Sequence, residues 1–214
     1  MLRNLKRNKD KGFSLVELVV TIAIVVILIT MIVPNVVGYI ERAAKMSAMN
    51  TLRVMVNGME VSIVERSVGQ GVMYTNKTYT SEYYDGGKTL PCGFLTNWML
   101  KKAQNDRTYD VNADNYADFL IAKDILETVS SQRGVRNPPL KFTNANRPLG
   151  ASCKTYCTNS TDGAIFAYAP SGGVYFAQLC VKGRWLVTYE HGIYTVEKVT
   201  NSTKFVGTEK LNGS

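Results

Sequence analysis

One long apolar stretch constrains this chain more than any other feature of its sequence. Residues 13–33 read FSLVELVVTIAIVVILITMIV, which is 21 residues with a single charge at Glu17. At about 1.5 Å of rise per residue, a helix of this length crosses a hydrocarbon core of about 30 Å. Because a bilayer offers no partners to unpaired backbone amides, the sequence predicts a membrane-spanning helix over residues 13–33.

Basic residues immediately precede the apolar stretch. Residues 1–12 hold five basic side chains against Asp10 and supply half of the formal net charge of +8. Positive flanks stay on the cytoplasmic side, so we expect a cytoplasmic N-terminus and export of the chain beyond residue 33. The remaining charge is too diffuse for a nucleic-acid groove, and we expect no nucleic-acid site. The basic residues are Arg3, Lys6, Arg7, Lys9 and Lys11.

The carboxylate of Glu17 is costly in this position. An ionised carboxylate in a membrane helix costs about 3 kcal/mol on insertion scales, and such groups usually have a functional partner. A nearby cation would stabilise Glu17. The alternative is that its side chain reaches toward the lipid head groups, because Glu17 lies only about 6 Å from Phe13 along the helix axis.

The helical pattern continues beyond the apolar stretch. Pro34 removes a backbone hydrogen bond and bends a helix, and taken alone it is also compatible with a helix end. Apolar residues nevertheless recur after it at steps of three or four, which predicts one helix from Phe13 to about Arg66, about 80 Å long. Outside a bilayer its apolar half is soluble only against copies of itself, and non-closing contacts of that kind build a filament. The stripe is Val37, Ile40, Ala44, Ala48, Leu52, Met55, Met59 and Ile63.

The start of the apolar stretch resembles the class III signal of type IV prepilins. The sequence KGFSLVE at residues 11–17 carries a glycine after the basic leader, a phenylalanine and an acid four residues later. The resemblance covers residues 6–66. It implies that a prepilin peptidase cuts between Gly12 and Phe13, that the new amine of Phe13 is methylated, and that the helix is retained. It further implies that Glu17 pairs with the amine of a neighbouring subunit during assembly and that Pro34 bends the helix.

The rest of the chain, residues 67–214, is expected to form a globular head. Helices are predicted at residues 94–103 and 117–131, after a loop-rich region with a strand near residues 72–79. Apolar alternation between glycine turns predicts an antiparallel meander, which the exported helix half, residues 34–66, would cover. The pilin resemblance implies the same α+β, pilin-like fold. The four predicted strands are residues 164–169, 174–181, 184–190 and 193–199.

All four cysteines lie in the exported part, where thiols are commonly oxidised. Two disulfides are therefore expected among Cys92, Cys153, Cys157 and Cys180, with all three pairings open. A bond from Cys153 or Cys157 to Cys180 would staple an irregular segment to a strand. The alternative is a structural zinc held by these thiolates, with His191 as a further ligand.

These features predict a structural subunit rather than an enzyme. With one histidine and no acid–base partner motif, we expect no catalytic residues, no metal and no cofactor. The favoured function is a major or minor pilin of a type IV pilus, serving adhesion, motility or surface attachment. Its partners would be prepilin peptidase and other pilin subunits, and it would move from the membrane to a surface filament. A pseudopilin of a secretion or DNA-uptake system, and a single-pass anchored binding protein or enzyme, are the alternatives.

Overall fold

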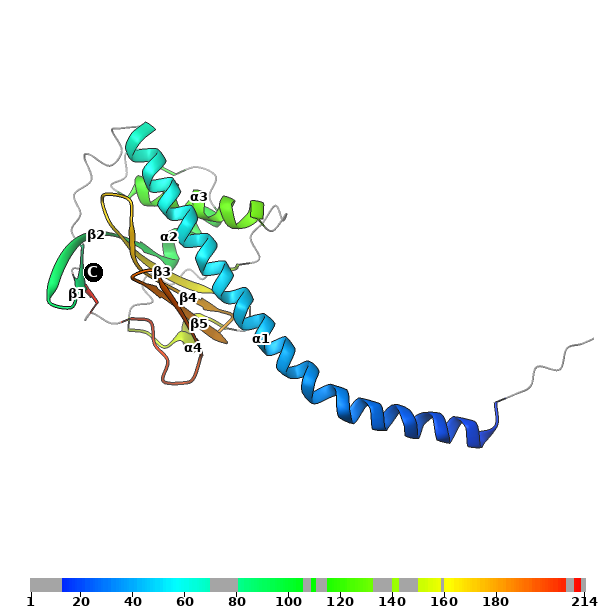
Figure 1. The fold of residues 1–214 in the computed structure, drawn as a ribbon. Coiled ribbons are helices and arrows are strands. Elements are labelled where there is room, and N and C mark those ends of the chain that lie inside the picture. The colour runs from blue at the N-terminus through cyan, green and yellow to red at the C-terminus, as the bar shows by residue number, and fades with distance from the viewer. Residues whose placement is uncertain are drawn as a thin grey trace, which may run out of the picture. The chain divides into compact units, whose positions relative to one another are not determined.

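The computed structural model describes residues 13–69, 81–105, 109–110, 115–132, 140–142, 150–158, 160–206 and 210–212 (Figure 1). The chain divides into two compact units, Met1–Ala44 and Lys45–Ser214. We call them the N-terminal unit and the C-terminal unit. Residues 1–12, where a leader is expected, and the strand expected near residues 72–79 lie outside the described residues.

A single helix, α1 (Leu15–Gly69), contributes to both units. It is 55 residues long and continues through Pro34, which confirms the prediction of one uninterrupted helix. The predicted apolar stripe is buried in the C-terminal unit from Ala48 to Ile63, where Leu52 and Met55 are completely buried in the core. Its first members, Val37 and Ile40, are exposed.

The C-terminal unit is built on one seven-stranded sheet with the order β6-β5-β4-β3-β2-β1-β7, in which all neighbours are antiparallel. The expected meander is confirmed as β3 to β6. His191-Gly192 form a two-residue turn between Glu190 and Ile193, and both have the positive φ that such a hairpin requires. Lys182 and Gly183 also have positive φ, in the three-residue connection between Val181 and Trp185. The strands are β1 (Ser81–Asp85), β2 (Lys88–Thr96), β3 (Gly163–Tyr168), β4 (Val174–Val181), β5 (Trp185–Glu190), β6 (Ile193–Lys198) and β7 (Leu211–Asn212).

Three shorter helices accompany the sheet: α2 (Asn97–Asn105), α3 (Tyr116–Gln132) and α4 (Cys153–Tyr156). α3 confirms the helix predicted at residues 117–131. The helix predicted at residues 94–103 was wrong at its start, because residues 94–96 pair with β3 as the end of β2. The expectation of a loop before residue 92 was also wrong, since residues 81–96 form the β1–β2 hairpin around Gly86-Gly87.

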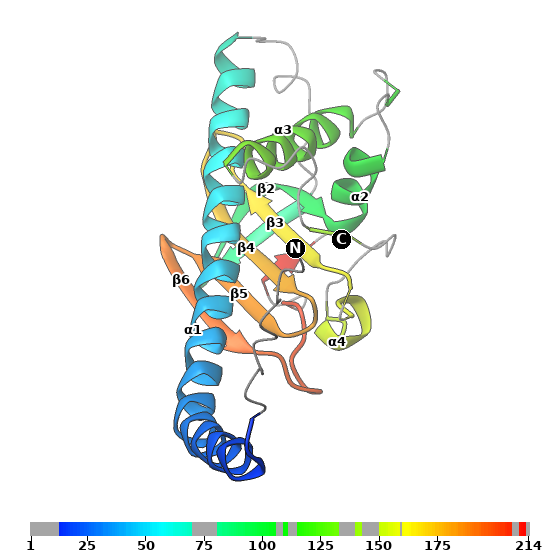
Figure 2. The same ribbon diagram turned by 90° about the vertical axis from the view of Figure 1, so that its right-hand side faces the viewer.

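Apolar side chains lie on both faces of the sheet and form two clusters. On one face, Phe166 of β3 and Leu179 of β4 pack with α3 and the second half of α1. Figure 2 shows these two helices over the strands. On the other face, Ile165, Phe176 and Leu186 pack with cysteine side chains. The helix-covered sheet predicted from the sequence is therefore observed, with α3 as a second covering helix.

Polar contacts connect α1 to α3 beside this core. Arg66 donates from Nη2 to Oδ2 of Asp124 at 2.6 Å, and the Ser62 hydroxyl donates to the same oxygen at 2.5 Å. One turn away, a Cβ on Gly58 would lie 3.1 Å from the Thr128 side chain, so the two helices approach closely there. The polar contacts at Asp124 and the close approach at Gly58 hold α3 against α1.

Two hairpin ends meet at one side of the sheet. The Tyr83 hydroxyl of β1 donates to the Glu190 carboxylate at 2.6 Å, and Lys210 also donates to that carboxylate. His191 lies in the β5–β6 turn, with its Nε2 3.2 Å from Oδ1 of Asp85. Burial, with a further contribution from Glu190, raises the pKa of Tyr83, so its hydroxyl stays a proton donor at neutral pH.

Gly93→Ala should destabilise the C-terminal unit strongly. A Cβ at Gly93 would lie 2.0 Å from the ring of Tyr168, which is completely buried and donates a hydrogen bond to Asp118. Forcing this ring aside costs about 1 to 3 kcal/mol for the overpacking alone. We therefore expect thermal unfolding of the detergent-solubilised chain to begin on the order of 5 °C lower.

Gly173→Ala is the matched control, because a Cβ there meets no atom within 4 Å. It should leave the melting temperature within about 1 °C of the wild type. Equal melting temperatures for Gly93→Ala and Gly173→Ala would contradict the close packing of Tyr168 on β2.

Candidate functional site

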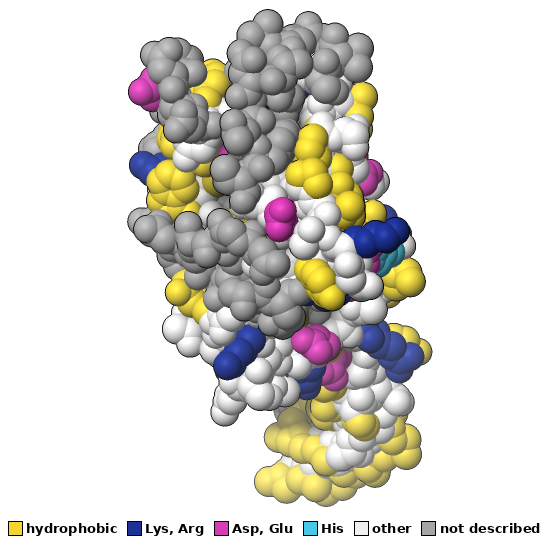
Figure 3. All heavy atoms as spheres, turned by 90° about the vertical axis from the view of Figure 1, so that its left-hand side faces the viewer, with side chains coloured by type: hydrophobic (Ala, Val, Ile, Leu, Met, Phe, Trp, Pro, Cys, Tyr) yellow, Lys and Arg dark blue, Asp and Glu magenta, His cyan; other side chains and the backbone are white. Residues whose placement is uncertain are grey.

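The candidate site is the apolar surface of the N-terminal part of α1. Large hydrophobic side chains from Phe13 to Ile40 are exposed by between 44 and 83%. Figure 3 shows them gathered over this part of the helix, at the bottom of the view. Soluble monomers rarely expose contiguous apolar patches larger than a few hundred Å². The helix is long and apolar enough to cross a membrane, and this surface needs either lipid or other chains around it.

The polar side chains inside this surface bond to their own helix. The Thr21 hydroxyl donates to the carbonyl of Glu17, and the Thr30 hydroxyl donates to the carbonyl of Ile27 at 2.8 Å. The Asn35 amide donates to the carbonyl of Met31 at 3.3 Å. Because these donors are satisfied within the helix, they reduce the cost of placing it in an apolar environment.

Glu17 caps the helix to which it belongs. The Ser14 backbone N–H donates to Oε2 of Glu17 at 3.2 Å, and the Leu18 N–H donates to the carbonyl of Ser14 at 3.2 Å. Ser14 and Glu17 thus have the spacing and half of the hydrogen bonding of a capping box, and an acid in a first turn also interacts favourably with the helix dipole. This role was not predicted from the sequence, although the pattern Ser-x-x-Glu was visible.

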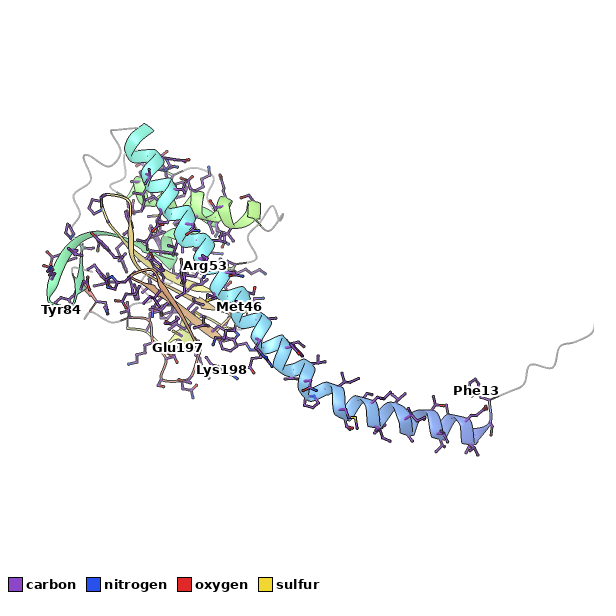
Figure 4. The ribbon with its side chains drawn as sticks, viewed as in Figure 1. Phe13, Met46, Arg53, Tyr84, Glu197 and Lys198 are labelled. Atoms are coloured by element: carbon purple, nitrogen blue, oxygen red, sulfur yellow. The ribbon has the colours of Figure 1, made fainter. Side chains whose placement is uncertain are left out.

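The other residues expected at this site are placed as follows. Gly12 lies outside the described residues, and Phe13 is the first described residue, at the exposed end of the helix (Figure 4). Pro34 lies inside α1. Cleavage after Gly12, methylation of Phe13, intersubunit pairing of Glu17 and bending at Pro34 stay predictions.

The structure brings three of the four cysteines together. Cys153 is the first residue of the single turn of α4, Cys157 follows its last residue, and both side chains hydrogen-bond with Cys180 of β4. All four cysteines are buried and carry free thiols in the structure. Cys92 lies on β2, beside Glu82.

The buried thiols are poor nucleophiles as long as they stay buried. Burial, with a smaller effect of Glu82, raises the pKa of Cys92 to about 11. The hydrogen bond with Cys180 and burial raise the pKa of Cys153. On Cys180, the hydrogen bond with Cys153 lowers the pKa, but the hydrogen bond with Cys157 and burial outweigh it and raise the pKa.

A zinc site gains no support from this arrangement. Among the residues that the structure describes, no group of three or more His, Cys, Asp and Glu side chains has a geometry that could hold a metal ion. His191, the ligand considered with the cysteines, contacts Asp85 at the hairpin end.

Comparison with known families agrees with the geometry of the N-terminal helix. Residues 7–33 match the model of the prokaryotic N-terminal methylation motif, the class III signal of type IV pilins. The motif indicates a precursor of the type IV pilin or pseudopilin type. The fold agrees with this, because a long apolar N-terminal helix continues onto an antiparallel sheet in an α+β, pilin-like architecture. Searches of curated proteins and of solved structures found no match.

Proposed function

We propose that this chain is a structural subunit of a type IV pilus, processed after Gly12 and polymerised through α1. The observation that carries the proposal is the apolar surface from Phe13 to Ile40, which none of the described residues buries and which overlaps the methylation motif of residues 7–33 over residues 13–33. A prepilin motif implies processing by prepilin peptidase and assembly with other pilin subunits.

The proposal assigns a role to each part of the chain. Residues 1–12 are the leader, residues 13–33 span the membrane and later form the filament core, and residues 34–66 are the exported helix half. Residues 67–214 form the head that the filament displays for adhesion, motility or attachment. Before assembly the N-terminus is cytoplasmic, and afterwards the subunit lies at the cell surface.

A pseudopilin of a secretion or DNA-uptake system is the second candidate, because the same motif and helix serve both kinds of assembly. Abundant surface fibres containing this chain would favour the pilus. A short assembly that is needed for secretion would favour the pseudopilin. An anchored enzyme or binding protein working alone would need neither cleavage after Gly12 nor assembly.

The test is the N-terminus of the mature protein. We expect mass spectrometry of sheared surface material to find fibres whose subunit begins at an N-methylated Phe13. A mature chain that begins at Met1, or at a residue after the apolar segment, would rule out the proposed processing. A processed chain that is found only as a monomer would rule out the filament.

A further inference from the structure

The three clustered thiols are arranged around Cys180. Cys180 lies on β4 opposite Gly163 of β3, on the sheet face that carries Ile165 and Leu186. Cys153 and Cys157 are four residues apart, and the Cys157 N–H donates to the carbonyl of Cys153 at 2.8 Å. Residues at this spacing lie on one side of a helical turn. Cys153 of α4 and Cys157, the residue that follows α4, both interact with Cys180 on the sheet.

Backbone contacts hold α4 in this position. The Cys153 N–H donates to the carbonyl of Thr203 at 2.9 Å. A Cβ at Gly183 would lie 1.9 Å from the carbonyl oxygen of Cys157, and a Cβ at Gly163 would lie 2.9 Å from its sulfur. Only glycine at these two positions lets α4 approach the sheet so closely. The proximity of the three sulfurs is thus built into the packing of β3 and of the β4–β5 turn.

Cys92 is too distant to join them. Its neighbour Gly93 pairs with Tyr168 at the end of β3, whereas Cys180 pairs with Gly163 at the beginning of β3. The five residue steps from Gly163 to Tyr168 span about 16 Å at about 3.3 Å per residue. A disulfide requires Cα atoms within roughly 7 Å. A second bond inside the chain would need Cys92, which has no cysteine within reach.

We propose that Cys180 forms the one intrachain disulfide of the C-terminal unit and that either Cys153 or Cys157 can serve as its partner. The inference rests on the proposed export of this unit to an oxidising compartment. The two thiols lose two protons and two electrons, and the disulfide of an exported thiol–disulfide oxidoreductase takes them up and becomes a dithiol. The new S–S bond connects the segment before β3 to the middle of the sheet.

In the test, the full-length chain is purified in detergent and oxidised with glutathione disulfide. Its disulfide bonds are then mapped by mass spectrometry after alkylation of the remaining thiols and digestion with trypsin. The sequence makes the two isomers distinguishable, because trypsin cuts at Lys154 and leaves Cys157 and Cys180 together in residues 155–182. A Cys153–Cys180 bond joins two peptides, 142–154 and 155–182. A Cys157–Cys180 bond lies within one peptide and lowers its mass by two hydrogen atoms.

Single variants separate the partners. In Cys153→Ser we expect only the bond within peptide 155–182, and in Cys157→Ser only the joined pair of peptides. Cys180→Ser should form no intrachain bond and should leave the other three thiols alkylated. Cys92→Ser is the matched control and should form the same bonds as the wild type.

Three outcomes would overturn the proposal: an intrachain bond to Cys92, an intrachain bond in Cys180→Ser, or loss of the bond in either Cys153→Ser or Cys157→Ser. Because the oxidation is carried out on purified protein, its failure is distinguishable from failure of the pilus proposal. The latter is measured separately, on the mature N-terminus and on fibres.

Discussion

Gly12→Leu should leave the chain as an unprocessed precursor in the membrane, with the mature form reduced at least tenfold. Glycine is used where a backbone must approach another group closely, and a leucine side chain would hold the scissile carbonyl of residue 12 away from the peptidase. A loss of about 1.4 kcal/mol in transition-state stabilisation already gives a tenfold slower reaction. Intact-mass measurement of membrane extracts separates the two forms, since the precursor is heavier by residues 1–12.

Gly38→Leu is the control for this experiment. Gly38 also lies in α1, and a Cβ there would meet only the end of the Arg42 side chain, at 3.8 Å. This variant should be cleaved like the wild type, whatever it does to later packing. If Gly12→Leu were processed to the same extent as Gly38→Leu, cleavage at the Gly12–Phe13 bond would be disproved.

Glu17→Gln should be processed normally but should enter filaments at least tenfold less than the wild type. Glutamine at this position can still accept the hydrogen bond from the Ser14 N–H, so the helix cap is retained while the charge is removed. Leaving the amine of a neighbouring subunit buried without a counter-charge costs about 3 to 5 kcal/mol. The measurement is the fraction of processed subunit recovered in sheared fibres.

Two further variants make the result specific. Glu17→Ala removes both the charge and the cap, and Glu65→Gln removes a charge from an exposed position in the second half of α1. We expect Glu17→Ala to enter filaments as poorly as Glu17→Gln, and Glu65→Gln to assemble like the wild type. If Glu17→Gln assembles normally and Glu17→Ala does not, the cap is what matters and the pairing role is wrong.

Strong periodic signals made most of the fold predictable from the sequence. The apolar stripe from Val37 to Ile63 repeats over many turns, and it predicted a helix that passes Pro34. The alternating strands from β3 to β6 are separated by short turns with glycine, and the short turns after β4 and β5 fix the register of β4, β5 and β6. In both cases local pattern and long-range packing favour the same structure.

The errors came where the local pattern was weak or misleading. Residues 94–96 have apolar spacing that also fits a helix, and their pairing with β3 depends on a partner about 70 residues away in the chain. In the β1–β2 hairpin, β1 is short and mostly polar, so the Gly86-Gly87 turn was the local signal for the hairpin. The proximity of Cys153, Cys157 and Cys180 likewise depends on tertiary packing, which cysteine spacing alone does not reveal.

The unburied helix surface from Phe13 to Ile40 has an energetic consequence for the proposed function. Lipid tails and the apolar helices of neighbouring subunits are similarly hydrophobic. Transfer of this helix surface from lipid to a filament therefore gains little free energy from the release of water. For this segment, the membrane-embedded state and the proposed filament state are then nearly equal in free energy. Side-chain shape decides between them, and a subunit that leaves a fibre can return to the bilayer without unfolding.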